Sequence, residues 1–150
     1  MTAAADGTWS LPTNVTGNVI HSYTETSTLG ANTASSTGVT LYSPAAHKTL
    51  QGGSGNDVLI GQPNDTLIAG TGADTFVFNP GFGKETITGF DVTKDVIAFV
   101  HALATSFTDL GIQDNAQGNA VITFAGDTQD KITLTGVHSS ALQASDFKFV

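Results

Sequence analysis

The sequence predicts an all-β fold: a short right-handed parallel β-roll (a β-solenoid), followed by a β-rich C-terminal cap. Large apolar residues recur at spacings of nine, nine, eight and nine residues, at Leu41, Leu50, Leu59, Leu67 and Phe76. The 150 residues include 17 glycines, and only 12% are charged, against about 25% in typical domains. A nine-residue period fits neither an α-helix nor a hairpin, and frequent glycines indicate many tight turns.

The composition argues against several classes of function. Thirteen acidic residues face five lysines and no arginine, giving a formal net charge of -8. Because guanidinium groups are the usual means of gripping phosphate, we expect no nucleic-acid partner. The chain has no cysteine, which excludes disulfides, thiolate metal sites and cysteine nucleophiles. No apolar run approaches the roughly 20 residues of a membrane helix, so no membrane span is expected.

The chain is expected to divide into three segments. Residues 1–40 form an N-terminal extension, in which the Ser/Thr-rich residues 22–40 fit either a linker or a polar-faced strand ladder. Residues 41–78 hold the roll, and residues 79–150 form the cap. The cap is expected to contain antiparallel strands at residues 85–88, 96–100, 120–124, 131–135 and 147–150. Single helical turns are expected at residues 106–110 and 140–144, each opened by a serine.

Two segments carry the nonapeptide G-G-x-G-x-D-x-U-x, in which U is a large apolar residue. Residues 52–60 carry it in full, and residues 69–77 depart from it only at Ala69. Between them, residues 61–68 form a copy that has lost one residue and two glycines but keeps Asp65. The preceding copy, residues 43–51, has Lys48 where the aspartate belongs, so this rung is expected to be structural only.

The repeat predicts a metal site made of oxygen atoms. If each nonapeptide is one tight turn plus one short strand, two repeats complete a circuit and alternate repeats stack on the same side. Glycines such as Gly53 and Gly55 let backbone carbonyls point inward, while the aspartate at the sixth position closes the same cup. Calcium accepts about six to eight hard oxygen ligands in loose geometry, so calcium is the expected ion.

Residues 52–60 and 71–78 resemble the RTX (repeats-in-toxin) calcium-binding repeats and their closing segment. Residues 89–97 are similar to the aspartate-bearing stretch that follows the roll in serralysin-like proteases, alginate epimerases and other type I secreted proteins. The resemblance covers residues 50–150. It implies a C-terminal region of this kind that binds one to three calcium ions.

The resemblance also implies which residues hold these ions. A first site places Asp57 and Asp74 across one ion, with carbonyl oxygens from Gly53, Gly55, Gly70 and Gly72. On the opposite edge lies Asp65, and Glu85 stands where many relatives have aspartate. Asp91 or Asp95 closes the last site, although both also fit turn and strand-end residues that bind backbone amides.

As a member of this family, the chain would be a calcium-binding module rather than an enzyme. It would fold on calcium binding outside a Gram-negative cell and serve the folding, stability and secretion of a larger exported protein. Its implied partners are type I secretion machinery and an N-terminal catalytic domain of the parent protein. Residues 146–150 resemble a C-terminal secretion signal interrupted by Lys148, and fit a final cap strand equally well. The alternative function is a polysaccharide-binding or adhesin module attached to a secreted enzyme.

The remaining reactive side chains do not suggest catalysis. The four histidines are scattered, and no two have the spacing of a helical zinc pair. Ser54 lacks the closing glycine of a nucleophile elbow. Trp9, Tyr23 and Tyr42 fit either a sugar-stacking platform or the core, and the core is expected.

Overall fold

The computed structural model describes residues 2–3, 9–10, 38, 40–43 and 46–150, and it builds them from strands and short 3₁₀ turns. Within these residues, no helix has the length and apolar character to cross a membrane. The choice between linker and strand ladder for residues 22–40 lies almost wholly outside the described residues, as do the side chains of Trp9 and Tyr23. A short antiparallel pair joins Thr2–Ala3 (β1) to Trp9–Ser10 (β2).

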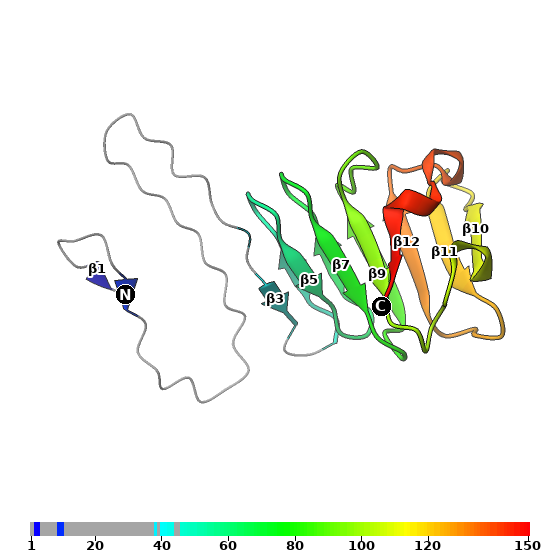
Figure 1. The fold of residues 1–150 in the computed structure, drawn as a ribbon, viewed down its shortest axis with the longest axis horizontal. Helices are drawn as coiled ribbons and strands as arrows, with labels where there is room; N and C mark the ends of the chain where they lie inside the picture. The colour runs from blue at the N-terminus through cyan, green and yellow to red at the C-terminus, as the bar shows by residue number, and fades with distance from the viewer. Residues whose placement is uncertain (1, 4–8, 11–37, 39, 44–45) are drawn as a thin grey trace.

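The strands of the roll alternate between two sheets (Figure 1). The five-stranded sheet has the order β13-β9-β7-β5-β3 and contains Thr40–Tyr42 (β3), Val58–Ile60 (β5), Thr75–Phe78 (β7), Val96–Phe99 (β9) and Phe147–Phe149 (β13). The six-stranded sheet has the order β10-β11-β12-β8-β6-β4 and contains Thr49–Gln51 (β4), Thr66–Ile68 (β6), Lys84–Thr88 (β8), Leu110–Asp114 (β10), Ala120–Phe124 (β11) and Lys131–Thr135 (β12).

The register confirms that alternate repeats stack on the same side. In the five-stranded sheet, Leu59 is paired with both Leu41 and Phe76 in parallel strands. In the other sheet, Leu50 is paired with Leu67. Each three-residue strand buries its central apolar residue and turns its two outer residues away from the core. The all-β parallel roll predicted from the nine-residue period is therefore confirmed.

The core changes character toward the C-terminal end of the stack. The roll holds one file of leucines in each sheet, whereas phenylalanines fill the space beneath the last strands. Phe78 packs on Phe82 with ring centroids 4.8 Å apart, and Phe99 meets Phe124 edge to face at 5.1 Å. Phe147 of β13 stacks on Phe99 with centroids 6.1 Å apart, which ties the last strand into the same cluster.

The prediction that the strands beyond Phe78 pair antiparallel was wrong for most of them. β8 pairs in parallel with β6 and β12, and β9 pairs in parallel with β7 and β13. Beyond Phe78, antiparallel pairing among the described strands is found only between β10 and β11 and between β11 and β12, and β10 was not predicted. The turns after Phe78 no longer keep the nine-residue length, so the period is lost although parallel stacking continues. Where the roll ends and the cap begins stays a proposal.

Two smaller expectations had different outcomes. A 3₁₀ turn at Phe107–Asp109 follows Ser106 as predicted, and a second at Ser139–Ala141 starts one residue earlier than expected. Tyr42 does not join the core, because 59% of its surface is exposed. Its hydroxyl instead accepts a hydrogen bond from the Gln62 amide at 3.1 Å.

The turns of the roll stack so closely that some glycines have no room for a side chain. Gly70 adopts φ +95°, and a Cβ built on it would lie 2.1 Å from the Gly53 carbonyl oxygen of the previous rung. At Gly72 a Cβ would lie 1.8 Å from the Gly55 carbonyl oxygen. Both atoms belong to backbone, which cannot swing aside. These glycines are therefore required by the distance between rungs as well as by their positive φ.

We expect Gly70→Ala to disrupt the roll far more than Gly126→Ala. Both residues have positive φ, but a Cβ on Gly126 meets no described atom within 4 Å. The control therefore bears only the conformational strain, about 1–2 kcal/mol, whereas Gly70→Ala must also separate two rungs. Urea unfolding at fixed calcium concentration measures both changes. Equal losses of stability would show that close stacking does not constrain this turn.

Candidate metal site

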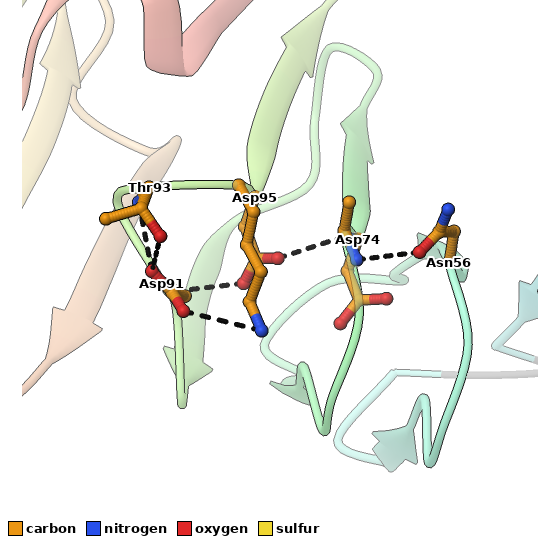
Figure 2. A network of polar contacts seen from close by, with 7 residues as sticks. Asn56, Asp74, Asp91, Thr93 and Asp95 are labelled. Atoms are coloured by element: carbon orange, nitrogen blue, oxygen red, sulfur yellow. Dashed lines mark hydrogen bonds and ion pairs between the residues drawn. The ribbon is translucent and has the colours of Figure 1, made fainter.

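A row of buried carboxylates runs along one side of the roll, formed by the turns that precede β5, β7 and β9, here called the first edge. The carboxylates of Asp74 and Asp95 each accept the backbone N–H of the aspartate that precedes them on this edge. Asp74 Oδ1 accepts the Asp57 N–H at 2.8 Å. Asp95 Oδ1 accepts the Asp74 N–H at 2.9 Å (Figure 2). The asparagine before Asp57 makes the same kind of contact, because Asn56 Oδ1 accepts the Ala73 N–H at 2.9 Å.

The first edge brings several carboxylates close together, and Lys94 supplies a positive charge at its end. Asp57 and Asp74 are each 1% exposed, and Asp95 is 3% exposed. Among the described residues, Asp74 Oδ2 is buried and has no hydrogen-bond partner. Burial raises the pKa of Asp74 above its usual range, and the charges of Asp95 and Asp57 add to this effect. A buried carboxylate oxygen in this state is best stabilised by a cation.

Asp91 and Asp95 are placed at the end of this row. Asp95 Oδ2 accepts the Asp91 N–H at 2.9 Å, so its two oxygens connect two turns. Asp91 is more open: its carboxylate accepts the Thr93 N–H and hydroxyl and pairs with Lys94 at 3.4 Å. These contacts lower the pKa of Asp91, the Thr93 hydrogen bonds most strongly. Both residues thus bind backbone amides, and their role as ligands stays a prediction.

The glycine carbonyls predicted as ligands lie in the same turns. Thr71 donates its N–H to the Gly53 carbonyl oxygen at 2.8 Å, and Gly55 donates to the Thr71 carbonyl oxygen at 2.9 Å. Gly70 and Gly72 lie directly against Gly53 and Gly55. These four glycines therefore lie in the two stacked turns that also carry Asp57 and Asp74. Which of their carbonyl oxygens bind an ion is not tested by this arrangement and stays a prediction.

A second row of carboxylates lies on the other side of the roll, here called the second edge, and consists of Asp65 just before β6 and Glu85 near the start of β8. Asp65 Oδ1 accepts the Lys48 N–H at 2.6 Å, and Asp65 Oδ2 accepts the Gln62 N–H at 2.7 Å. Glu85 Oε1 accepts the Asp65 N–H at 3.0 Å. The ladder of the first edge is thus repeated, except that Lys48 contributes only its backbone and Glu85 replaces an aspartate.

Burial, with smaller contributions from the nearby charges of Asp65 and Asp130, raises the pKa of Glu85 to about 7 against the opposing hydrogen bonds. Asp130, which precedes β12, accepts the N–H groups of Gly81 and Gly83 at 2.7 Å each. Sequence reasoning missed Asp130, because it lies outside the repeats. Among the described residues, no group of three or more His, Cys, Asp or Glu side chains is arranged to hold a metal ion.

Both edges therefore fit a cation that takes much of its coordination from backbone oxygens. The donor set consists of carboxylates and closely stacked carbonyl groups, which are hard ligands suited to calcium. Bound there, calcium supplies positive charge next to the buried carboxylates. The described residues offer no sulfur ligand and no clustered histidines for a softer metal.

Comparison with known families agrees with this chemistry. Residues 49–63 and 64–89 match the family model of the RTX calcium-binding nonapeptide repeat. The chain carries RTX repeats. These repeats bind calcium ions, so the calcium predicted from the sequence is confirmed as the ion of the RTX segment. The site residues within the RTX segment are not identified individually by this match.

Solved structures resemble the chain to different degrees. The AlgE6R3 subunit of the mannuronan C5-epimerase from Azotobacter vinelandii is 27% identical, with a TM-score of 0.51, over 73% of this chain and 72% of that one. The AlgE6R2 subunit of the same enzyme is 22% identical with a TM-score of 0.42, covering 70% of this chain and 88% of the subunit. The extracellular lipase LipA from Serratia marcescens is 23% identical with a TM-score of 0.42 over 70% of this chain, which spans only 20% of the lipase. No curated protein sequence matches the chain.

We expect protonation of the buried carboxylates at low pH to stabilise the fold in part as calcium does. Glu85 has a folded pKa of about 7 against its usual 4.5, so the stability it contributes is complete below about 4.5 and is lost as the pH rises through 7. Asp74 acts in the same direction. Asp91, Asp109, Asp114 and Asp127 have lowered pKa values, and their contribution is lost only below their usual 3.8. In calcium-depleted buffer, β-type circular dichroism should therefore be stronger at pH 5 than at pH 7.5.

The matched variant for this measurement is Glu85→Gln, which cannot ionise. Its signal should depend less on pH between 5 and 7.5 than that of the unaltered chain. An identical pH dependence in both proteins would show that Glu85 does not carry the effect.

Proposed function

We propose that the RTX segment is a calcium-dependent folding module within a larger exported protein. The observation that carries this proposal is the ladder of buried carboxylates on the first edge. Asp57, Asp74 and Asp95 lie in neighbouring turns of this edge. The backbone amide of Asp57 donates to the Asp74 carboxylate, and that of Asp74 donates to the Asp95 carboxylate. Asp74 Oδ2 has no hydrogen-bond partner among the described residues. Without a cation, folding must bury these charges against one another, which opposes the formation of the roll.

The concentration at which calcium acts supports a role outside the cell. Extracellular calcium modules have dissociation constants of about 0.1–1 mM. In a cytoplasm poor in free calcium, carboxylate repulsion and the entropy of the glycine-rich turns would keep the segment loose. After export, millimolar calcium would pair the carboxylates and drive folding. Type I secretion machinery and a catalytic domain of the parent protein are the partners this role requires.

This role needs no catalytic group in the chain itself. The parent protein's catalytic domain would do the chemistry, and the RTX segment would support its folding and stability. The epimerase whose AlgE6R3 subunit resembles this chain is an example of an enzyme that contains such a subunit.

We expect the chain to be largely unfolded in calcium-depleted buffer at pH 7.5 and to gain β-type circular dichroism cooperatively between about 0.1 and 1 mM calcium. Magnesium should not replace calcium, because it demands a stricter octahedral geometry and keeps its waters. Asp74→Asn should move the calcium midpoint upward by removing one of the charges that calcium pairs. Asp127→Asn is the control, since Asp127 caps only the Gln129 and Asp130 amides of its own loop.

Identical spectra and melting temperatures in excess chelator and in calcium would contradict the proposal. A midpoint below the free calcium of the cytoplasm would contradict the link to export. Equal shifts for Asp74→Asn and Asp127→Asn would contradict the assignment of the first edge.

A second candidate function is binding of an acidic polysaccharide on the outer face of the six-stranded sheet. Lys84 and Lys131 are paired in register on β8 and β12, and the next outward pair is Thr86 and Thr133. Two neighbouring cations beside a row of hydroxyl groups suit a linear polymer of uronic acids. Calorimetry with mannuronan oligomers in saturating calcium tests this candidate, and Lys84→Gln should weaken any binding. Binding that is unchanged in that variant would argue against this face.

A further inference from the structure

The outer faces of the two sheets differ in chemistry. On the six-stranded sheet the outward residues of β8 and β12 are lysines and threonines. On the five-stranded sheet the outward residues of β5, β7 and β9 are Val58, Ile60, Thr75, Val77, Val96 and Ala98. All of them except Ala98 are partly exposed. In Figure 1, no described segment lies across the front of β5 or β7. A group of neighbouring exposed apolar side chains is typical of an interaction surface.

One row of outward residues crosses the whole five-stranded sheet in register. It consists of Tyr42, Ile60, Val77, Ala98 and Lys148, each paired with the next across parallel strands. The uncharged side chains of this row become smaller from β3 to β9. Tyr42 is 59% exposed at one end, whereas Ala98 is 4% exposed near the other. The face is therefore raised at β3 and low at β9, and the exposed Lys148 follows on β13.

A second row is symmetric about β7, the middle strand of the five. It places Val58 and Val96 on the two sides of Thr75. A two-fold axis parallel to the strands and passing over β7 would lay this face on that of a second copy. Val58 would then lie opposite Val96, and Thr75 opposite the second Thr75. A surface that matches itself under a two-fold rotation is what an isologous dimer requires.

The same rotation also matches the first row by size and charge. Ile60 of one copy would lie opposite Ala98 of the other, so that a large side chain meets a small one, and Val77 would lie opposite itself. Tyr42 would lie opposite Lys148, whose ammonium group can rest on the aromatic ring. The Gln62 amide donates to the Tyr42 hydroxyl at 3.1 Å and restrains the ring on this face. A single axis therefore satisfies both rows.

We propose that the outer face of the five-stranded sheet binds a second copy of this chain, with the two sheets stacked face to face around a two-fold axis over β7. The outward residues of β3, β5, β7, β9 and β13 include no acidic side chain, so the net charge of -8 opposes association only at longer range. The face measures about 10 by 20 Å. This is small for a specific interface, so the dimer is weak and reversible.

Analytical ultracentrifugation of the full chain in saturating calcium tests the proposal. From micromolar to millimolar protein, the average mass should rise from that of one chain toward that of two. Added salt should strengthen the association, because it screens the repulsion between two acidic chains. The mass of one chain at every concentration would overturn the proposal and leave the face to another occupant, such as a domain of the parent protein. Circular dichroism of the same samples shows whether the roll is folded, so a failure of calcium-dependent folding is distinguishable.

Val77 lies on the proposed axis and gives the sharpest variant. Val77→Lys sets two lysines against each other and should weaken the dimer by about a hundredfold or more. Val77→Glu should do the same, whereas an equal mixture of the two variants should associate again as a heterodimer. The control is Thr86→Lys on the outer face of the other sheet, which should associate as the unaltered chain does. A dimer that persists in Val77→Lys, or folded variants that do not associate when mixed, would overturn the proposal.

Tyr42 and Lys148 provide a second test if the Val77 variants do not fold, because both side chains are exposed. Tyr42→Lys sets two lysines against each other at both ends of the dimer and should weaken it. Adding Lys148→Glu to the same chain restores opposite charges and should recover association. Within one chain β3 and β13 are the two edges of the sheet, so this exchange acts only between copies. Association that is unchanged in Tyr42→Lys, or not recovered in the double variant, would overturn the two-fold arrangement.

Discussion

The hydrogen bond between an aspartate N–H and the carboxylate of the next rung is the contact on which the roll depends. It recurs from Asp57 to Asp74, from Asp74 to Asp95 and, on the other edge, from Asp65 to Glu85. Each bond satisfies a buried amide and sets the spacing of two turns, but it also places two carboxylates close together. The same contact therefore organises the roll and opposes its folding. We propose that a cation between the rungs removes the opposing part, so that calcium binding favours folding.

The two edges meet this requirement differently. On the first edge, nonapeptide turns with glycines at fixed positions let consecutive rungs approach until only hydrogen atoms fit at Gly70 and Gly72. On the second edge a glutamate, Glu85, makes the contact that aspartates make on the first edge, and Asp130 accepts the N–H groups of Gly81 and Gly83 in the turn before β8. The first edge can thus be specified by a short local repeat. Asp130 lies after β10 and β11 in the sequence, outside the repeats.

The sequence allowed the regular part of this structure to be predicted and little of the irregular part. The spacing of Leu50, Leu59 and Leu67 predicted the stacking, and the aspartates in step with them predicted the first edge. Parallel pairing of β8, β9, β12 and β13 left no such signal, because pairing between distant strands does not depend on a fixed period. Tyr42 occupies an outward position of β3, and aromatic character alone could not reveal that. Asp130 was missed because it lies outside the repeats and because its partners, Gly81 and Gly83, are distant in sequence.

The small core of each repeat explains why the roll relies on its neighbours. A nonapeptide rung buries one large side chain, such as Leu59 or Leu67, for about nine residues that must be ordered. Burial of one leucine stabilises the repeat by less than the ordering of its backbone costs. Hydrogen bonds between rungs, bound cations and a neighbour that is already ordered must supply the remainder. The phenylalanines around Phe99 are the aromatic part of a hydrophobic core that also includes the leucines of the roll. Order is therefore expected to spread from this cluster into the roll. The hydrogen bonds from Gly81 and Gly83 to Asp130 lie in the turn before β8, between the two parts.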